Sequence, residues 1–168
     1  MNKLLDDWTL LVVLLGSIIA LTALGTIVVR HRIKGNVTIA VASILGIFAG
    51  VGGASHGPGE ILQGNTAPSG IIIQAWPDLT SLSGEPAMTL IPSFSVSGIV
   101  TVITGIAVTV WATTTRIQSK KGGLVLILLS IMMLLVGGGL IPPALGVVAG
   151  IIGARVRQKD LKTSRQKA

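Results

Sequence analysis

The stretch "GGLVLILLSIMMLLVGGGLIPPALGVVAGIIGA", residues 122–154, has no charged side chain in 33 positions. As one straight helix it would be about 50 Å long, at about 1.5 Å per residue. That is too long for one crossing of a hydrocarbon core of about 30 Å, and about 10 Å too short for two full crossings. Its centre, "GGGLIPP" (137–143), has two prolines that remove backbone donors and three glycines that weaken a helix. We therefore predict two short helices, at about 123–138 and 143–156, joined by this turn.

The rest of the chain is similarly apolar. Half of its 168 residues are hydrophobic and only 11% are charged, where soluble domains have about 25%. Other long uncharged stretches predict membrane spans at about 8–29, 37–54 and 93–115. We therefore expect a single all-α membrane domain, a small polytopic helix bundle of five hydrophobic segments in the cell membrane. The absence of cysteine excludes disulfides and thiolate metal sites.

The basic residues predict which side of the membrane each end occupies. Twelve of the thirteen lie in three blocks: "RHRIKG" (30–35), "RIQSKK" (116–121) and "RVRQKDLKTSRQKA" (155–168). Because Lys and Arg in short loops favour the cytoplasmic side, we expect the N-terminus outside and the C-terminus inside. The net acidic start "MNKLLDD" favours a retained anchor over a signal peptide. An alternative with the same termini has four spans, with the last stretch as a re-entrant hairpin.

The C-terminal segment, residues 157–168, is a basic cytoplasmic tail in this interpretation. We expect it to fix the topology and to contact anionic lipid headgroups, at about 1 kcal/mol for each charge near the surface. It has no aromatic side chain for stacking on bases, so we expect no nucleic-acid partner.

Two glycine pairs predict close helix packing. Gly46 and Gly50 lie in "GIFAG", and Gly146 and Gly150 lie in "GVVAG". Lipid tails are as apolar as leucine, so helices in a membrane associate through close approach at small residues. We expect these glycines to pack helices within one chain, in preference to forming a dedicated dimer face.

The stretch "AGVGGASHGPGEILQG" (49–64) follows the second predicted span. Its Gly-Pro-Gly sequence around Pro58 predicts the end of the helix. His56 and Glu60 would then lie just outside the hydrophobic core, at the hinge of an extracytoplasmic cap formed by residues 55–92. The segment "IIIQAW" in this cap is predicted either as a short strand or as a stretch lying flat at the interface. One His and one Glu are too few ligands for a zinc site, so we expect no metal and no other cofactor.

The sequence contains no recognisable catalytic group. We therefore expect a non-enzymatic membrane protein that associates with itself or with a membrane protein partner through its outer segment. One alternative is a passive channel or small-solute facilitator built from the third span, with Thr101, Thr104 and Thr109, and the "GGGLIPP" turn. A less favoured alternative is a membrane enzyme that uses His56 and Glu60 with Asp78 at the outer face. No ionisable residue lies within the four apolar blocks, which argues against an ion-coupled transporter.

Overall fold

The computed structural model describes residues 37–74, 86–114, 117 and 119–166, together with isolated positions between 15 and 27. Over these residues the chain is mostly helical. The predicted span at 8–29 falls largely outside this description, but its described positions are helical, and Gly25 lies against Ile47. The main elements are α2 (Val37–Leu62), β1 (Ile72–Gln74), β2 (Pro86–Met88), α4 (Phe94–Thr113), α5 (Lys120–Leu135) and α6 (Ile141–Gln166).

The turn predicted in the longest uncharged stretch is confirmed. Helix α5 ends at Leu135 and α6 begins at Ile141, so "GGGLIPP" separates two helices. Within the turn, Gly137 and Gly139 have φ values of 113° and 76°. Side chains with a Cβ rarely adopt such angles, so the glycines are required for the reversal itself.

The outer ends of these two helices differ from the prediction. Helix α5 begins three residues earlier than expected because Ser119 caps it: its hydroxyl accepts a hydrogen bond of 2.8 Å from the Gly122 N–H. Helix α6 continues past residue 156 to Gln166, so most of the basic tail is helical. Lys, Arg and Gln favour helix, which explains the continuation.

The predicted end of the second helix at the Gly-Pro-Gly sequence was wrong. Helix α2 is continuous to Leu62 and contains Pro58, so residues 55–62 belong to the helix and not to the cap. Proline removes one hydrogen bond inside a helix, at a cost of about 3 kcal/mol. Tertiary packing offsets this loss, because the same turn of α2 lies directly against α4: a Cβ built on Gly57 would be 2.5 Å from the Gly98 carbonyl oxygen.

A small antiparallel sheet completes one end of the molecule. β1 pairs with β2, and Ile73 lies opposite Ala87. The strand alternative for "IIIQAW" is therefore correct at Ile72–Gln74, while residues 75–85 lie outside the described residues. The chain after β2 is tied to the end of α5, where the Leu90 N–H donates to the Leu135 carbonyl at 3.0 Å. The hairpin is thus joined to the helix bundle by backbone hydrogen bonds.

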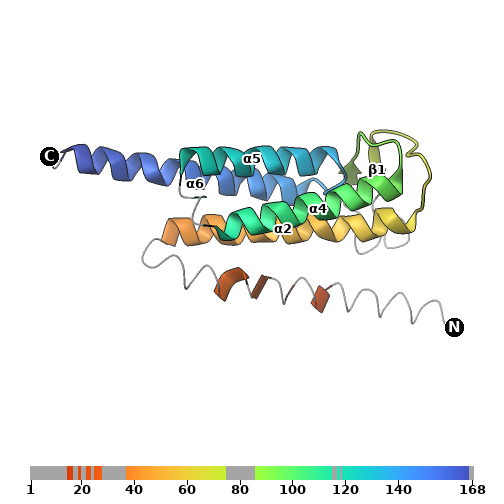
Figure 1. Cartoon of the computed structure of the whole chain (residues 1–168), viewed down its shortest axis with the longest axis horizontal. Coiled ribbons are helices and arrows are strands. Elements are labelled where there is room, and N and C mark those ends of the chain that lie inside the picture. Colours follow the sequence, from red (N-terminus) through yellow and green to blue (C-terminus); the bar gives the residue numbers. More distant parts are fainter. Residues whose placement is uncertain are drawn as a thin grey trace.

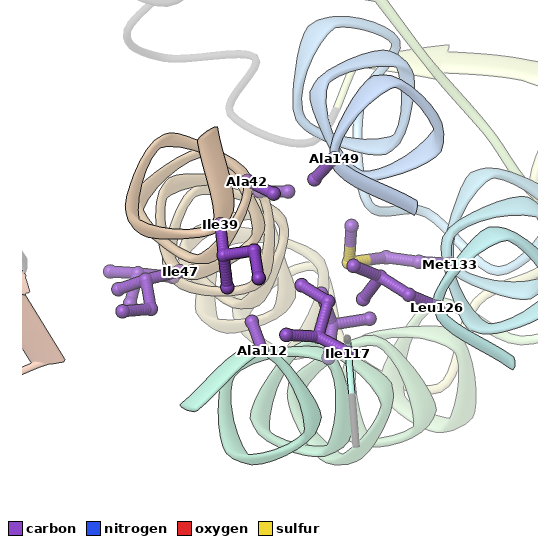
Figure 2. Close-up of a cluster of buried hydrophobic side chains, with 11 residues drawn as sticks. Ile39, Ala42, Ile47, Ala112, Ile117, Leu126, Met133 and Ala149 are labelled. Carbon is purple, nitrogen blue, oxygen red and sulfur yellow. The ribbon is translucent and has the colours of Figure 1, made fainter. Parts of the chain in front are cut away.

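The four described helices lie side by side along the length of the molecule, with the hairpin at one end (Figure 1). Helix α2 packs against both α4 and α6, and α5 packs against α6. The side chains between them are mostly small or medium-sized, including Ala42, Ala112 and Ala149, with Leu126 and Met133 filling the centre (Figure 2). Consecutive helices run in opposite directions, so the "GGGLIPP" turn lies at the hairpin end and the start of α5 lies at the other.

Two of these helices, α2 and α4, are long and apolar enough to cross a membrane, as judged by length and composition. The apolar parts of the other two, Lys121–Leu135 and Ile141–Arg155, are shorter.

Candidate functional site

A buried polar cluster lies where α2, α4, α5 and the hairpin meet. Its side chains are Glu60 of α2, Ser97 and Thr101 of α4, and Thr89, which follows β2; all four are buried. Val136, the C-cap of α5, contributes its backbone carbonyl. The cluster therefore joins the two stretches that the sequence singled out, "AGVGGASHGPGEILQG" and "GGGLIPP".

The hydroxyl groups of the cluster form a chain with a definite direction. A carbonyl oxygen can only accept, so both Ser97 Oγ, at 2.8 Å, and Thr101 Oγ1 donate to the Val136 carbonyl. Ser97 has no second proton, so Thr89 Oγ1 must be the donor in its 2.7 Å contact with Ser97 Oγ. Thr89 Oγ1 in turn accepts from the Ile91 N–H at 3.1 Å. Every hydroxyl proton of this group is therefore already committed.

Glu60 is the least satisfied member of the cluster. It is 0% exposed, and neither carboxyl oxygen has a hydrogen-bond partner among the described residues. The Ser97 hydroxyl lies beside the carboxyl, and the Val136 carbonyl, 2.8 Å from Ser97 Oγ, competes with Glu60 for its proton. On its other side the carboxyl lies against Gly137, where an added Cβ would be 2.6 Å from Glu60 Cδ. The carboxyl is therefore enclosed by protein without a donor.

The prediction that His56 and Glu60 lie at a hinge beyond the end of the helix was wrong, because α2 is continuous through both residues. His56 is 9% exposed and, like Glu60, lies within α2. Residues four apart share one face of a helix, so the continuous helix places both side chains on the same side. Among the described residues, no three His, Asp or Glu side chains come together as a possible metal site. Asp78, the third residue of the enzyme alternative, lies outside the described residues.

The three threonines considered as a channel lining have separate roles. Thr104 and Thr109 donate to carbonyls of their own helix, at 2.7 and 2.9 Å, whereas Thr101 bonds across to Val136. Hydroxyls that bond back to the preceding turn are common in apolar helices. Their protons are thus committed within the bundle.

The predicted packing glycines all lie at contacts between helices. A Cβ on Gly46 would be 2.6 Å from Ala112 Cβ, and one on Gly50 would be 2.6 Å from the Gly105 carbonyl oxygen. The other pair lies between α6 and α5: Gly146 is against Ser130, and Gly150 is against Ile127 and the Gly123 carbonyl. These contacts are all within one chain.

Comparison of the chain with protein-family models, with curated proteins and with solved structures finds no match. The assignment of a role therefore depends on the geometry of the chain itself.

Sequence reasoning did not predict that Thr89, Ser97 and Gly137 lie in one cluster with Glu60. A usable signal existed for one of them, because Ser97 and Thr101 are four residues apart and must share a helix face. No sequence signal pairs that face with "GGGLIPP", since the contact depends on how α4 and α5 are arranged.

Proposed function

We propose that the chain is a multi-pass protein of the cell membrane, with its N-terminus outside and its C-terminus inside. Its role is non-catalytic and depends on association with itself or with a membrane protein partner through the outer segment. The arrangement of side chains on α4 carries the first part of this proposal. All three isoleucines of α4 after its first turn point outward, whereas most of its glycine and hydroxyl-bearing residues, together with Val108, face the other helices.

The contrast on α4 is large. Ile103 is 60% exposed and Val110 is 57% exposed, while Ser97, Gly98 and Gly105 are buried. A helix folded in water buries its large apolar side chains, because exposing them costs about 25 cal/mol per Å². In lipid this cost vanishes, and small residues that allow close backbone approach are the ones that favour helix contacts. The pattern on α4 therefore supports a lipid-facing outer surface.

Helix α5 has the same pattern, which supports the two-helix version of the last hydrophobic stretch. Leu128 is 64% exposed, whereas Gly123 and Ser130 are buried. At 16 residues α5 is about 24 Å long, somewhat short for a core of about 30 Å. Lys121 and Arg155 lie at the end opposite the hairpin, where long basic side chains can extend to the headgroups.

The outer segment supports the proposed association. Near the hairpin, four large apolar side chains are more than half exposed: Leu62, Ile71, Ile72 and Leu90. Exposed apolar groups on a short, structured segment are typical of surfaces that contact another protein or the membrane interface.

The membrane topology can be tested with two single-cysteine variants of this cysteine-free chain, Ser69→Cys and Ser164→Cys. A membrane-impermeant maleimide applied to intact cells should label Cys at position 69 and should label position 164 only after permeabilisation. Labelling of both positions from the same side would contradict the proposed topology.

Association can be tested by native mass spectrometry of the full chain released from mild detergent. We expect a homo-oligomer or a co-purifying partner, and Ile72→Ser should reduce that species. Val110→Ser changes a similarly exposed side chain near the end of α4 farther from the hairpin, and it should leave that species unchanged. A monomer without any partner would overturn the association.

A further inference from the structure

We infer that Glu60 is the centre of a site for one small monovalent cation, a proton or Na⁺, enclosed between α2, α4 and the "GGGLIPP" turn. This goes beyond the proposed association and does not depend on it. The starting observation is a carboxyl group that is 0% exposed and has no hydrogen-bond partner among the described residues. Burying an uncompensated carboxylate costs several kcal/mol, so a native fold that retains one needs a compensating positive charge.

The hydroxyl side chains around the carboxyl have no free proton to donate to it. Thr89, Ser97 and Thr101 each have one hydroxyl proton, and all three protons are directed along the chain that ends at the Val136 carbonyl. The oxygen of Ser97 keeps a lone pair beside the carboxyl, so it is suited to accept a proton from Glu60 or to ligate a cation.

The backbone at the start of α4 cannot supply a donor either. Its first N–H groups are all occupied: Phe94 N–H donates to the Thr66 carbonyl at 3.0 Å, and Ser95 N–H donates to the Gly64 carbonyl at 3.0 Å. Val96 N–H donates to the Ser93 hydroxyl at 3.5 Å. The helix N-terminus therefore does not act as an anion site for Glu60.

The nearby backbone favours positive charge. Val136 is the C-cap of α5, and the C-terminal end of a helix carries about half a negative charge from its carbonyl groups. In membrane transporters, backbone carbonyls and the C-terminal ends of half-helices bind Na⁺ or protons, and acidic side chains within the membrane take part in proton transfer. A single carboxylate matches one unit of positive charge, and no second acid lies on the described parts of the elements around it.

His56 is the one titratable side chain that the described parts of α2, α4, α5 and the hairpin place near Glu60. Residues of α4, α5 and the hairpin in this region contribute hydroxyl, amide and carbonyl groups, which do not titrate in the ordinary pH range. Any test must therefore separate Glu60 from His56 with one variant for each.

The full chain in lipid nanodiscs tests the site through its melting temperature. Wild type, Glu60→Gln and His56→Gln are compared at several pH values, in NaCl and in choline chloride of equal ionic strength. A proton site predicts that the melting temperature of the wild type falls as pH rises, without a difference between the salts. A Na⁺ site predicts that NaCl raises it above choline chloride at high pH. In both cases Glu60→Gln abolishes the response and His56→Gln retains it.

If the melting temperatures of wild type and Glu60→Gln respond in the same way to pH and to Na⁺, the proposed site is overturned. If Glu60→Gln does not fold, Glu60→Met removes the charge at similar size and takes its place. Infrared spectra of the wild type provide a readout that needs no variant to fold. In choline chloride, a protonated-carboxyl band that persists at high pH supports a bound proton. Loss of this band when Na⁺ is added supports a bound Na⁺ ion. If the band is absent in choline chloride at every pH and Na⁺ has no effect, the proposal is overturned.

Discussion

Replacing Gly50 with Ala should destabilise the protein by forcing α2 and α4 apart. A Cβ at this position would be 2.6 Å from both the Gly105 carbonyl oxygen and the Thr109 nitrogen. Both obstacles are backbone atoms, so neither can rotate away as the end of a flexible side chain can. Overpacking of this kind typically costs about 1–3 kcal/mol. The expected drop in melting temperature is about 2–4 °C for each kcal/mol in a chain of this size.

Gly52→Ala is the matched control, since it makes the same change two residues away on the same helix. Its Cβ would be 3.3 Å from Pro142 Cγ, the edge of a ring. Alanine is favoured over glycine in a helix interior by about 1 kcal/mol, so this variant should be neutral or slightly more stable. Both variants are compared by thermal unfolding in one detergent, followed by circular dichroism. Equal melting temperatures, or a more stable Gly50→Ala, would refute the close contact between α2 and α4.

Three further results are expected from the same unfolding assay. Gly137→Ala and Gly64→Ala both place alanine at positive φ, but only an alanine at position 137 also collides with Glu60. A Glu60→Ala background should therefore reduce the cost of Gly137→Ala and leave the cost of Gly64→Ala unchanged; equal costs of Gly137→Ala in both backgrounds would contradict the contact. Thr101→Val removes the hydrogen bond from Thr101 to the Val136 carbonyl, which still accepts one from Ser97. The free energy of unfolding should therefore fall by about 1 kcal/mol, and an unchanged value would count against the bond. Trp111→Phe removes the indole donation to the Gly122 carbonyl (2.9 Å), again at about 1 kcal/mol, and an unchanged melting temperature would mean the bond contributes nothing.

The parts of the fold that sequence predicted are those encoded by local chemistry. The reversal at "GGGLIPP" was predictable because glycine and proline act on their own backbone, wherever the rest of the chain lies. The glycines at 46, 50, 146 and 150 were recognisable because close approach at membrane helices requires small residues. Both features, the turn and the packing glycines, could be predicted without knowing which helices become neighbours.

The parts that sequence did not predict depend on partners far along the chain. Pro58 was interpreted as a helix terminator, which holds when a helix has to be stable on its own. Here the turn of α2 that contains Gly57 packs on Gly98, about forty residues later, and the contact offsets the lost hydrogen bond. The direction of the hydroxyl chain was equally hidden, because it depends on Thr89, Ser97 and Val136 meeting from three elements.

The continuation of α2 past Pro58 places an ionisable group inside the helix bundle, where the sequence predicted none. If Glu60 lay beyond the helix, water would solvate its charged carboxyl at little cost. In the structure the helix carries Glu60 against Gly137, and an added side chain at that glycine would collide with the carboxyl. The same lack of a side chain that permits the tight turn after α5 therefore makes room for the carboxyl. If α2 ended at Pro58, Glu60 would no longer be enclosed by the bundle. The close packing of α2 on α4 therefore explains both why the helix continues through Pro58 and why the buried polar cluster forms.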